Sequence, residues 1–189
     1  MKIAIFASGS GSNAENIANY FKESDIKISL ILTNNKDAFV LQRAEKLGIE
    51  SYVFDRNQFR NTTEVVDKLK ASGIDFIVLA GFLWLIPTSL IEAFPNKIIN
   101  IHPALLPNYG GKGMYGDKVH QAVYDNKETE TGITVHYVNE AYDEGAIIAQ
   151  HKAQLNEKDT PEDIANKVHE LEYKHFPKEI EKIALEIRR

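Results

Sequence analysis

Two kinds of segment alternate along this chain: short apolar runs rich in β-branched residues, and longer segments in which apolar residues recur every three or four positions. The short runs have the composition of strands that are buried on both faces of a sheet. The expected strands span residues 2–6, 27–33, 51–54, 75–80, 97–101, 132–138 and 146–155. The segments between the first five runs, such as the one containing Ile17 and Phe21, have the spacing of helices that bury one side. This alternation predicts an α/β fold.

The C-terminal part departs from this alternation. Its last two apolar runs are separated only by the polar stretch NEAYDEG, residues 139–145, which predicts an antiparallel pair of strands. After them, Thr160 and Pro161 are typical of the start of a helix. An apolar stripe follows at Ile164, Val168, Leu171, Phe176 and Ile180. We therefore predict one domain over residues 1–189, with a Rossmann-like, mostly parallel sheet flanked by helices, an antiparallel C-terminal strand addition and a long C-terminal helix.

Composition narrows the range of partners. The 22 basic and 27 acidic residues give a formal net charge of −5 and form no long runs, so we expect small-molecule partners rather than nucleic acid or a membrane. The chain has no cysteine, which excludes disulfides and thiolate nucleophiles, and its histidines lack the H-E-x-x-H spacing, so no metal is expected. The start MKIAIFASGS turns polar after Phe6, and no stretch approaches the ~20 apolar residues of a membrane span. We expect a cytoplasmic protein.

The stretch ASGSGSN, residues 7–13, joins the first expected strand to the first expected helix. Gly9, Gly11 and Ala14 fit the G-x-G-x-x-(G/A) spacing, which exposes backbone amides to an anion at a helix N-terminus. A dinucleotide site also needs an acidic residue at the end of the second strand, where this chain has Thr33–Asn35. The pattern therefore favours a phosphate monoester over NAD, although a tight turn that binds nothing fits the same spacing.

A second polar cluster ends the fifth expected strand, in NIHPALLP at residues 100–107. Asn100 and His102 are two positions apart, so they project from the same face of the strand at its C-terminal edge, where ligands bind in open α/β sheets. An amide that stabilises an oxyanion beside an imidazole that moves a proton suits acyl transfer. The alternative is that both side chains satisfy only local backbone groups.

Asp143 lies in the polar loop between the last two strands. An isolated aspartate there is usually a turn residue. If the loop folds back over His102, the carboxylate would favour imidazolium and raise the histidine pKa above its reference value of about 6.5.

Five stretches together resemble the folate-dependent phosphoribosylglycinamide formyltransferases of purine synthesis. They are GSGSN at 9–13, LAGFLWLIP at 79–87, NIHPALLP at 100–107, TGITVHYVNEAYDEGAIIAQ at 131–150 and the terminal helix. The resemblance runs nearly end to end. It implies transfer of a formyl group from the co-substrate 10-formyltetrahydrofolate to the amine of 5′-phosphoribosylglycinamide (glycinamide ribonucleotide), by direct attack and without a metal.

The resemblance also implies roles for individual residues. Asn100 and His102 match the catalytic pair, and Asp143 matches the carboxylate that tunes the histidine. The match for the substrate phosphate and ribose is Gly11, Ser12, Asn13 and Glu172. The match for the folate is Leu83, Trp84, Leu85 and Ile86, together with Asn100.

The chain departs from the family pattern at several positions. Trp84 stands where many relatives have an arginine, and Thr63 stands where an arginine reaches the folate tail, with Arg60 as the nearest substitute. In the glycine-rich loop at 108–120, Lys112 and His120 either contact a substrate or are solvated, and we favour solvated side chains for both.

Other functions remain open at this level. A formyltransferase that acts on another amine, such as an amino sugar, shares the Asn, His and Asp, and a non-catalytic nucleotide- or folate-binding sensor could use the same sheet. Both a monomer and a homodimer are compatible with the sequence.

Overall fold

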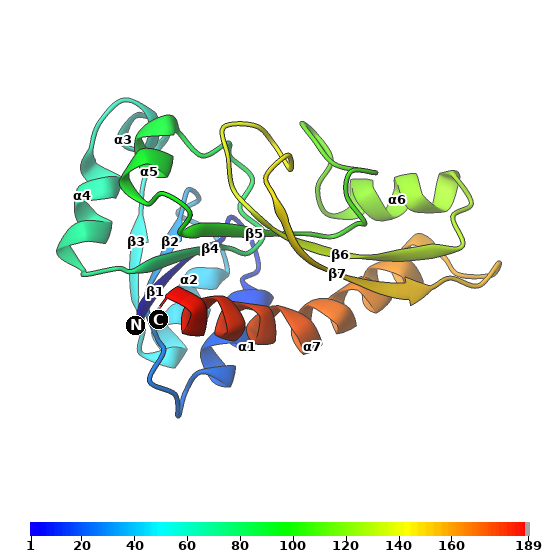
Figure 1. The fold of residues 1–189 in the computed structure, drawn as a ribbon, viewed down its shortest axis with the longest axis horizontal. Coiled ribbons are helices and arrows are strands. Elements are labelled where there is room, and N and C mark those ends of the chain that lie inside the picture. Colours follow the sequence, from blue (N-terminus) through cyan, green and yellow to red (C-terminus); the bar gives the residue numbers. More distant parts are fainter. Residues whose placement is uncertain (188–189) are drawn as a thin grey trace.

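The computed structural model describes residues 1–187 and contains a seven-stranded sheet (Figure 1). The strands are β1 (Lys2–Phe6), β2 (Lys27–Thr33), β3 (Glu50–Val53), β4 (Phe76–Leu79), β5 (Ile98–His102), β6 (Glu130–Tyr137) and β7 (Ile147–Gln154). Their order is β3-β2-β1-β4-β5-β6-β7. The first five pair in parallel, and β6 and β7 are antiparallel to their neighbours. The predicted fold class is confirmed; the last two residues of the expected 1–189 domain lie outside the described residues, and its extent as one domain stays a prediction.

Seven helices occur within residues 1–187. They are α1 (Ser12–Tyr20), α2 (Val40–Leu47), α3 (Arg56–Arg60), α4 (Glu64–Ala71), α5 (Thr88–Ala93), α6 (Asp117–Asp125) and α7 (Pro161–Ile187). The sequence pattern did not single out α3, α5 and α6, of which α3 and α5 have only five and six residues. A local signal for α3 exists, because Asp55 and Gln58 form a reciprocal capping box at its start. None of the helices in the described part of the chain is long and apolar enough to cross a bilayer.

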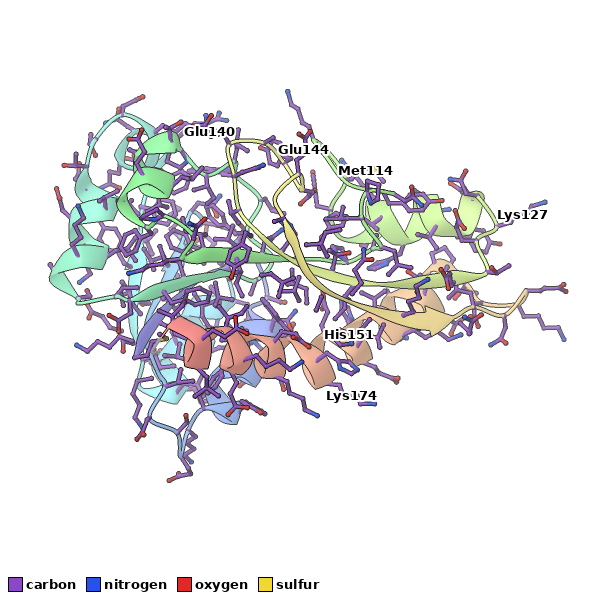
Figure 2. The ribbon with its side chains drawn as sticks, viewed as in Figure 1. Met114, Lys127, Glu140, Glu144, His151 and Lys174 are labelled. Atoms are coloured by element: carbon purple, nitrogen blue, oxygen red, sulfur yellow. The ribbon has the colours of Figure 1, made fainter. Side chains whose placement is uncertain are left out.

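Both faces of the sheet are covered, which explains the nearly continuous apolar strands. On β1, Ile5 belongs to the core beneath α1, α2 and α7, whereas Phe6 belongs to the core beneath α3, α4 and α5. Four of the five predicted stripe positions of α7 are buried, and Leu171 packs against the same core while partly exposed. Charged side chains such as Lys127 and Lys174 lie on the outer surface (Figure 2).

Two features of the topology create the candidate site. The parallel strands β1, β4 and β5 all end at the same edge of the sheet, so the segments that follow them meet there. In addition, β6 runs antiparallel beside β5, with Asn100 opposite His136 and His102 opposite Thr134. Because β6 is antiparallel to β5, it ends beside the start of β5, and the loop that follows it folds back along β5 until Asp143 reaches Asn100 and His102.

Candidate active site

A cavity of about 1010 Å³ opens at this edge of the sheet. Its walls include the loop after β1, the segment after β4, the end of β5, the loop before α6, the loop after β6 and the middle of α7. All the residues predicted for the site line this cavity: Gly11, Ser12, Asn13, Leu83, Trp84, Leu85, Ile86, Asn100, His102, Asp143 and Glu172. Their individual roles stay predictions, but the fold brings them to one place.

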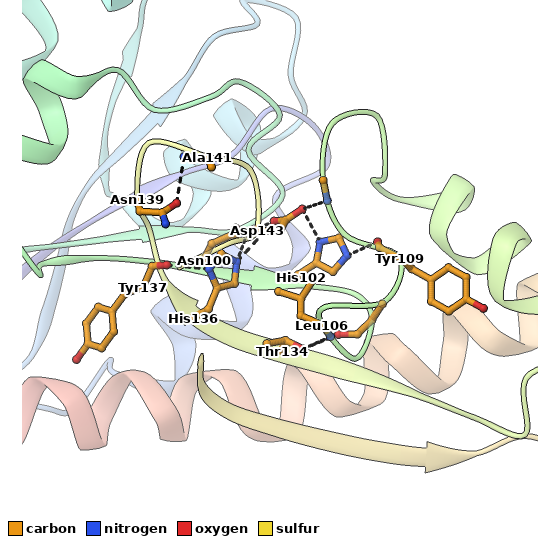
Figure 3. Close-up of polar contacts among 12 residues, drawn as sticks. Asn100, His102, Leu106, Tyr109, Thr134, His136, Tyr137, Asn139, Ala141 and Asp143 are labelled. Atoms are coloured by element: carbon orange, nitrogen blue, oxygen red, sulfur yellow. Dashed lines mark hydrogen bonds and ion pairs between the residues drawn. The ribbon is translucent and has the colours of Figure 1, made fainter. Parts of the chain in front are cut away.

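Asp143 connects the two polar residues of β5 (Figure 3). Its Oδ2 lies 3.4 Å from Nδ1 of His102, and its Oδ1 accepts a long hydrogen bond of 3.4 Å from Nδ2 of Asn100. His102 is only 3 % exposed, so the pair lies in a poorly hydrated part of the cavity wall. The loop after β6 does fold back over His102.

His136 is a fourth polar residue of this cluster, which the sequence reasoning did not single out. Its Nε2 lies 3.1 Å from Nδ2 of Asn100 and 3.6 Å from Oδ1 of Asp143, while its Nδ1 faces the carbonyl of Tyr137 at 2.8 Å. Because a carbonyl only accepts, Nδ1 is the donor in the contact with Tyr137. His136 lies within the quoted family stretch, but only the β5–β6 register places it beside Asn100.

The protonation of the central pair differs from the sequence-based expectation. Burial lowers the pKa of His102 below its ordinary value; Asp143 and the Tyr109 carbonyl act to raise this pKa but do not offset burial, and His136 lowers it further. The expectation that Asp143 would bring the pKa of His102 above its reference is therefore wrong. Burial also acts to raise the pKa of Asp143, but His136, His102 and the Gly111 N–H outweigh it and lower this pKa. At neutral pH we expect a carboxylate beside a neutral imidazole.

Both ring nitrogens of His102 nevertheless face oxygen acceptors. Nε2 lies 2.7 Å from the Tyr109 carbonyl, and Nδ1 faces the Asp143 carboxylate. A neutral imidazole has one N–H and can donate to only one of these oxygens. An added proton would be accommodated at once, because the imidazolium donates to both. The site is therefore built to receive a proton on His102.

The backbone at 109–111 holds this pair from the side of the glycine-rich loop. The Tyr109 carbonyl contacts His102, and the Gly111 N–H donates to Oδ2 of Asp143 at 2.9 Å. Gly110 lies between them, where a Cβ would be 2.5 Å from a methyl group of Leu106 and 3.4 Å from Cβ of Asp143. A side chain at this position would require the buried Leu106 side chain to shift.

Of the two side chains in residues 108–120 that were expected to be solvated, one is exposed and the other is buried. Lys112 is exposed, as expected, at the rim of the cavity. His120, at 4 % exposure, is buried, so the interpretation of it as solvated is wrong. Its ring lies edge-on to that of His169, 6.3 Å between centroids, and its Nδ1 has no hydrogen-bond partner within residues 1–187. Burial and the nearby His169 lower the pKa of His120.

The glycine-rich turn after β1 has both a packing role and free donors. Gly11 adopts φ 71°, and a Cβ there would lie 2.2 Å from a methyl group of Val40, so glycine is required where α1 meets α2. The N–H groups of Gly11, Ser12 and Asn13 make no hydrogen bond within the described residues. These donors, at the N-terminus of α1, form part of the cavity wall and are suited to an anion.

Glu172 of α7 meets this turn inside the cavity. Its Oε2 accepts a hydrogen bond of 2.9 Å from Nδ2 of Asn13, whose Oδ1 is buried and has no partner among residues 1–187. Burial raises the pKa of Glu172, and the Asn13 hydrogen bond only partly opposes this. The pair offers an acceptor and an unsatisfied amide oxygen beside the free backbone donors.

The segment after β4 lines the cavity beside the turn after β1, where the Leu83 N–H donates to the Ser8 hydroxyl at 3.1 Å. Leu83 is 45 % exposed, whereas Ile86 is buried in the core beneath α5. Trp84 packs edge-on against Phe54, and the guanidinium of Arg56 lies 5.7 Å from the Trp84 ring. Neither Arg60 nor Thr63 is among the residues that line the cavity. Arg56 does not line the cavity either, although it contacts Trp84, and the suggestion that Arg60 replaces the family arginine stays a prediction.

Comparisons of the sequence with a family model and with known proteins both match this chain to formyltransferases. A family model described as formyl transferase matches residues 1–180. The phosphoribosylglycinamide formyltransferase of Bacillus subtilis is 38% identical over 96% of this chain and 94% of that protein, and the chloroplastic one of Arabidopsis thaliana is 42% identical over 93% of this chain. This chain spans only 62% of the length of the Arabidopsis protein and 61% of that of its Vigna unguiculata counterpart.

Solved structures agree with these sequence relatives. The crystal structure of phosphoribosylglycinamide formyltransferase from Bacillus halodurans superposes with a TM-score of 0.87 at 34% identity, covering 97% of this chain and 95% of that one. The one from Anaplasma phagocytophilum has a TM-score of 0.89 at 32% identity, covering 98% of this chain and 87% of that one.

Proposed function

The chain belongs to the formyl transferase family, and we therefore propose that it transfers a formyl group from 10-formyltetrahydrofolate to the primary amine of 5′-phosphoribosylglycinamide, a step of purine biosynthesis. The observation that carries this proposal is the convergence of Asn100, His102 and Asp143 in one cavity with the free N–H groups of the turn after β1. Acyl transfer between two small molecules needs both a reacting centre and a place to anchor each partner.

The turn after β1 and α7 would anchor the acceptor. The free N–H groups of Gly11, Ser12 and Asn13 would donate to the phosphate, and the positive end of α1 favours its negative charge. The Glu172 carboxylate would accept a hydrogen bond from a ribose hydroxyl. This placement directs the glycinamide amine toward the end of β5.

The segment 83–86 would receive the folate ring system. It offers an apolar surface from Leu83 and backbone polar groups along an irregular stretch that lines the cavity. A flat heterocycle with donors and acceptors along one edge suits such a wall. Asn100 lines the same cavity, and the formyl group would be held beside it.

In the reaction, the amine nitrogen attacks the formyl carbon, the new C–N bond forms, and negative charge collects on the formyl oxygen. The N–H of Asn100 that makes only a long contact with Asp143 is the donor available to that oxyanion. Collapse of the intermediate breaks the bond to the folate nitrogen, which must gain the proton that the amine loses.

His102 is suited to carry this proton. It is neutral at rest, and the Asp143 carboxylate stabilises the imidazolium that forms. Transfer through Nε2 requires the Tyr109 carbonyl to move aside, since that oxygen holds Nε2 at 2.7 Å.

The direct test follows the loss of formyl folate by absorbance in the presence of 5′-phosphoribosylglycinamide, with an amino sugar phosphate as the control acceptor. We expect turnover with the first acceptor only. Preference for the amino sugar would contradict the proposed acceptor. Quenching of Trp84, the only tryptophan, by a folate with no turnover of either acceptor would indicate a sensor.

A further inference from the structure

Asp143 is presented by an irregular loop between β6 and β7, residues 138–146, which we call the Asp143 loop. Glu140 and Glu144 of this loop are exposed (Figure 2), and Asp143 itself has a left-handed backbone with φ 59°. At the base of the loop, a Cβ on Gly145 would lie 1.6 Å from the Tyr137 carbonyl oxygen, so the chain turns very tightly there. The loop is thus anchored firmly at its base but largely solvated toward its tip.

The contacts of the Asp143 carboxylate are too weak to hold it alone. Three of them, to His102, Asn100 and His136, measure 3.4, 3.4 and 3.6 Å, beyond the usual length of a strong hydrogen bond. Among residues 1–187, only the Gly111 N–H makes a short contact with this carboxylate, at 2.9 Å. The orientation of the carboxylate therefore depends on the backbone of the Asp143 loop.

A hydrogen bond ties the tip of this loop to the segment after β4, which also lines the cavity. The N–H of Leu85, in the segment after β4, donates to the hydroxyl oxygen of Tyr142 at 3.1 Å. The remaining side-chain hydrogen bond near the tip, from the Ala141 N–H to Oδ1 of Asn139, is internal to the loop. Tyr142 immediately precedes Asp143, so a displacement of one moves the other.

We infer that the Tyr142 hydroxyl is a positioning group for Asp143: by accepting from the Leu85 N–H, it fixes the Asp143 loop against the segment after β4 and so keeps the carboxylate facing His102. Its effect on turnover rests on the proposed function. This hydrogen bond joins the segment proposed to bind the folate to the loop that carries Asp143. It therefore fixes the position of the folate relative to the carboxylate that assists proton transfer.

The experiment compares Tyr142→Phe and Tyr142→Leu with wild type. Both lack the hydroxyl, and we expect kcat to fall at least ~5-fold in each, with KM for both substrates within about twofold, since small displacements of catalytic groups cost rate rather than binding. Tyr124→Phe is the matched control, because Tyr124 is an exposed tyrosine of α6 that does not line the cavity. This control should match wild type.

A second readout does not require formyl transfer. The titration of His102 is followed by NMR of isotope-labelled histidine, with His102→Ala to identify its signal. The groups that bear on this titration are Asp143, His136 and His120. Loss of the tether moves the carboxylate away, so the pKa of His102 should fall by ~0.5 unit or more in Tyr142→Phe, while that of His175 stays unchanged. A wild type that transfers no formyl group would refute the proposed function, and this titration would still decide the role of Tyr142.

Three results would overturn the inference. The first is a Tyr142→Phe variant with the kcat and the His102 titration of wild type. The second is loss of activity in Tyr142→Leu alone, which would assign the effect to the ring. The third is a lower KM for the formyl donor at unchanged kcat in Tyr142→Phe, which would mean that the hydroxyl merely covers a ligand-binding N–H.

Discussion

Oδ2 of Asp143 lies 3.4 Å from Nδ1 of His102, although the aspartate comes from an irregular loop and the histidine from the end of a buried strand. This contact is chemically useful because the imidazole is neutral at pH 7 whereas the carboxyl group is ionised. Burial keeps the pKa of His102 low enough for a neutral ring at pH 7, and the carboxylate is ready to stabilise the proton that this ring accepts.

Removal of either partner should abolish most of the activity. We expect His102→Ala and Asp143→Ala each to lower kcat at least ~100-fold, because proton transfer then lacks its carrier or the stabilising charge. Binding of the phosphorylated acceptor, measured by calorimetry, should persist, since the turn after β1 is untouched. Near-normal turnover in either variant would remove that residue from the mechanism.

The pH dependence of kcat/KM should reflect the neutral form of His102. Protonation disables a proton acceptor, so the rate should fall on the acid side with an apparent pKa below 6.5, in the direction that burial sets. Asp143→Asn removes the charge that raises the pKa of His102, so the acid limb of its residual activity should move to lower pH. A limb that moves to higher pH in this variant would contradict the assignment.

Gly110 should be intolerant of even a methyl group. In Gly110→Ala, the new Cβ would meet Leu106 at 2.5 Å and Asp143 at 3.4 Å, so we expect a loss of about 1–3 kcal/mol in the free energy of unfolding and a lower kcat. Gly48→Ala is the control, because Gly48 has φ 67° at the end of α2 with open space around it. This variant should lose stability through backbone strain but keep its kcat.

The free energy of unfolding should decrease as the pH falls below neutral. The pKa values of His102, His120 and His175 are all lowered in the folded protein, by burial first in each case. As the pH drops through the unfolded value of about 6.5, the unfolded chain binds protons that the native state does not, which favours unfolding. Urea titrations at several pH values measure this slope.

The His120→Gln variant tests how much the buried His120 contributes to this pH dependence of stability. The variant removes a buried titrating group, so its stability should depend less steeply on pH between neutral and mildly acid conditions. A wild-type protein whose stability rises on acidification through this window would contradict the directions of these three pKa shifts.

The sequence by itself determined the local architecture, because the signals for strands and long helices lie in neighbouring residues. The apolar runs predicted every strand to within a residue or two; the run expected at 97–101 forms β5 at 98–102. The two-residue spacing of Asn100 and His102 likewise placed both on one face. The helices α3 and α5, of five and six residues, are too short to show a periodic pattern and were missed, as was the nine-residue α6.

Only the tertiary structure decided how these elements combine into a site. His136 joins Asn100 because of the β5–β6 register, His120 is buried by packing near α7, and Tyr142 accepts a hydrogen bond from Leu85 of the segment after β4. The pKa of His102 illustrates the reason. Its charged neighbour could be guessed from the sequence, but the burial that outweighs this neighbour depends on segments far apart in the chain, and burial exists only once they have packed together.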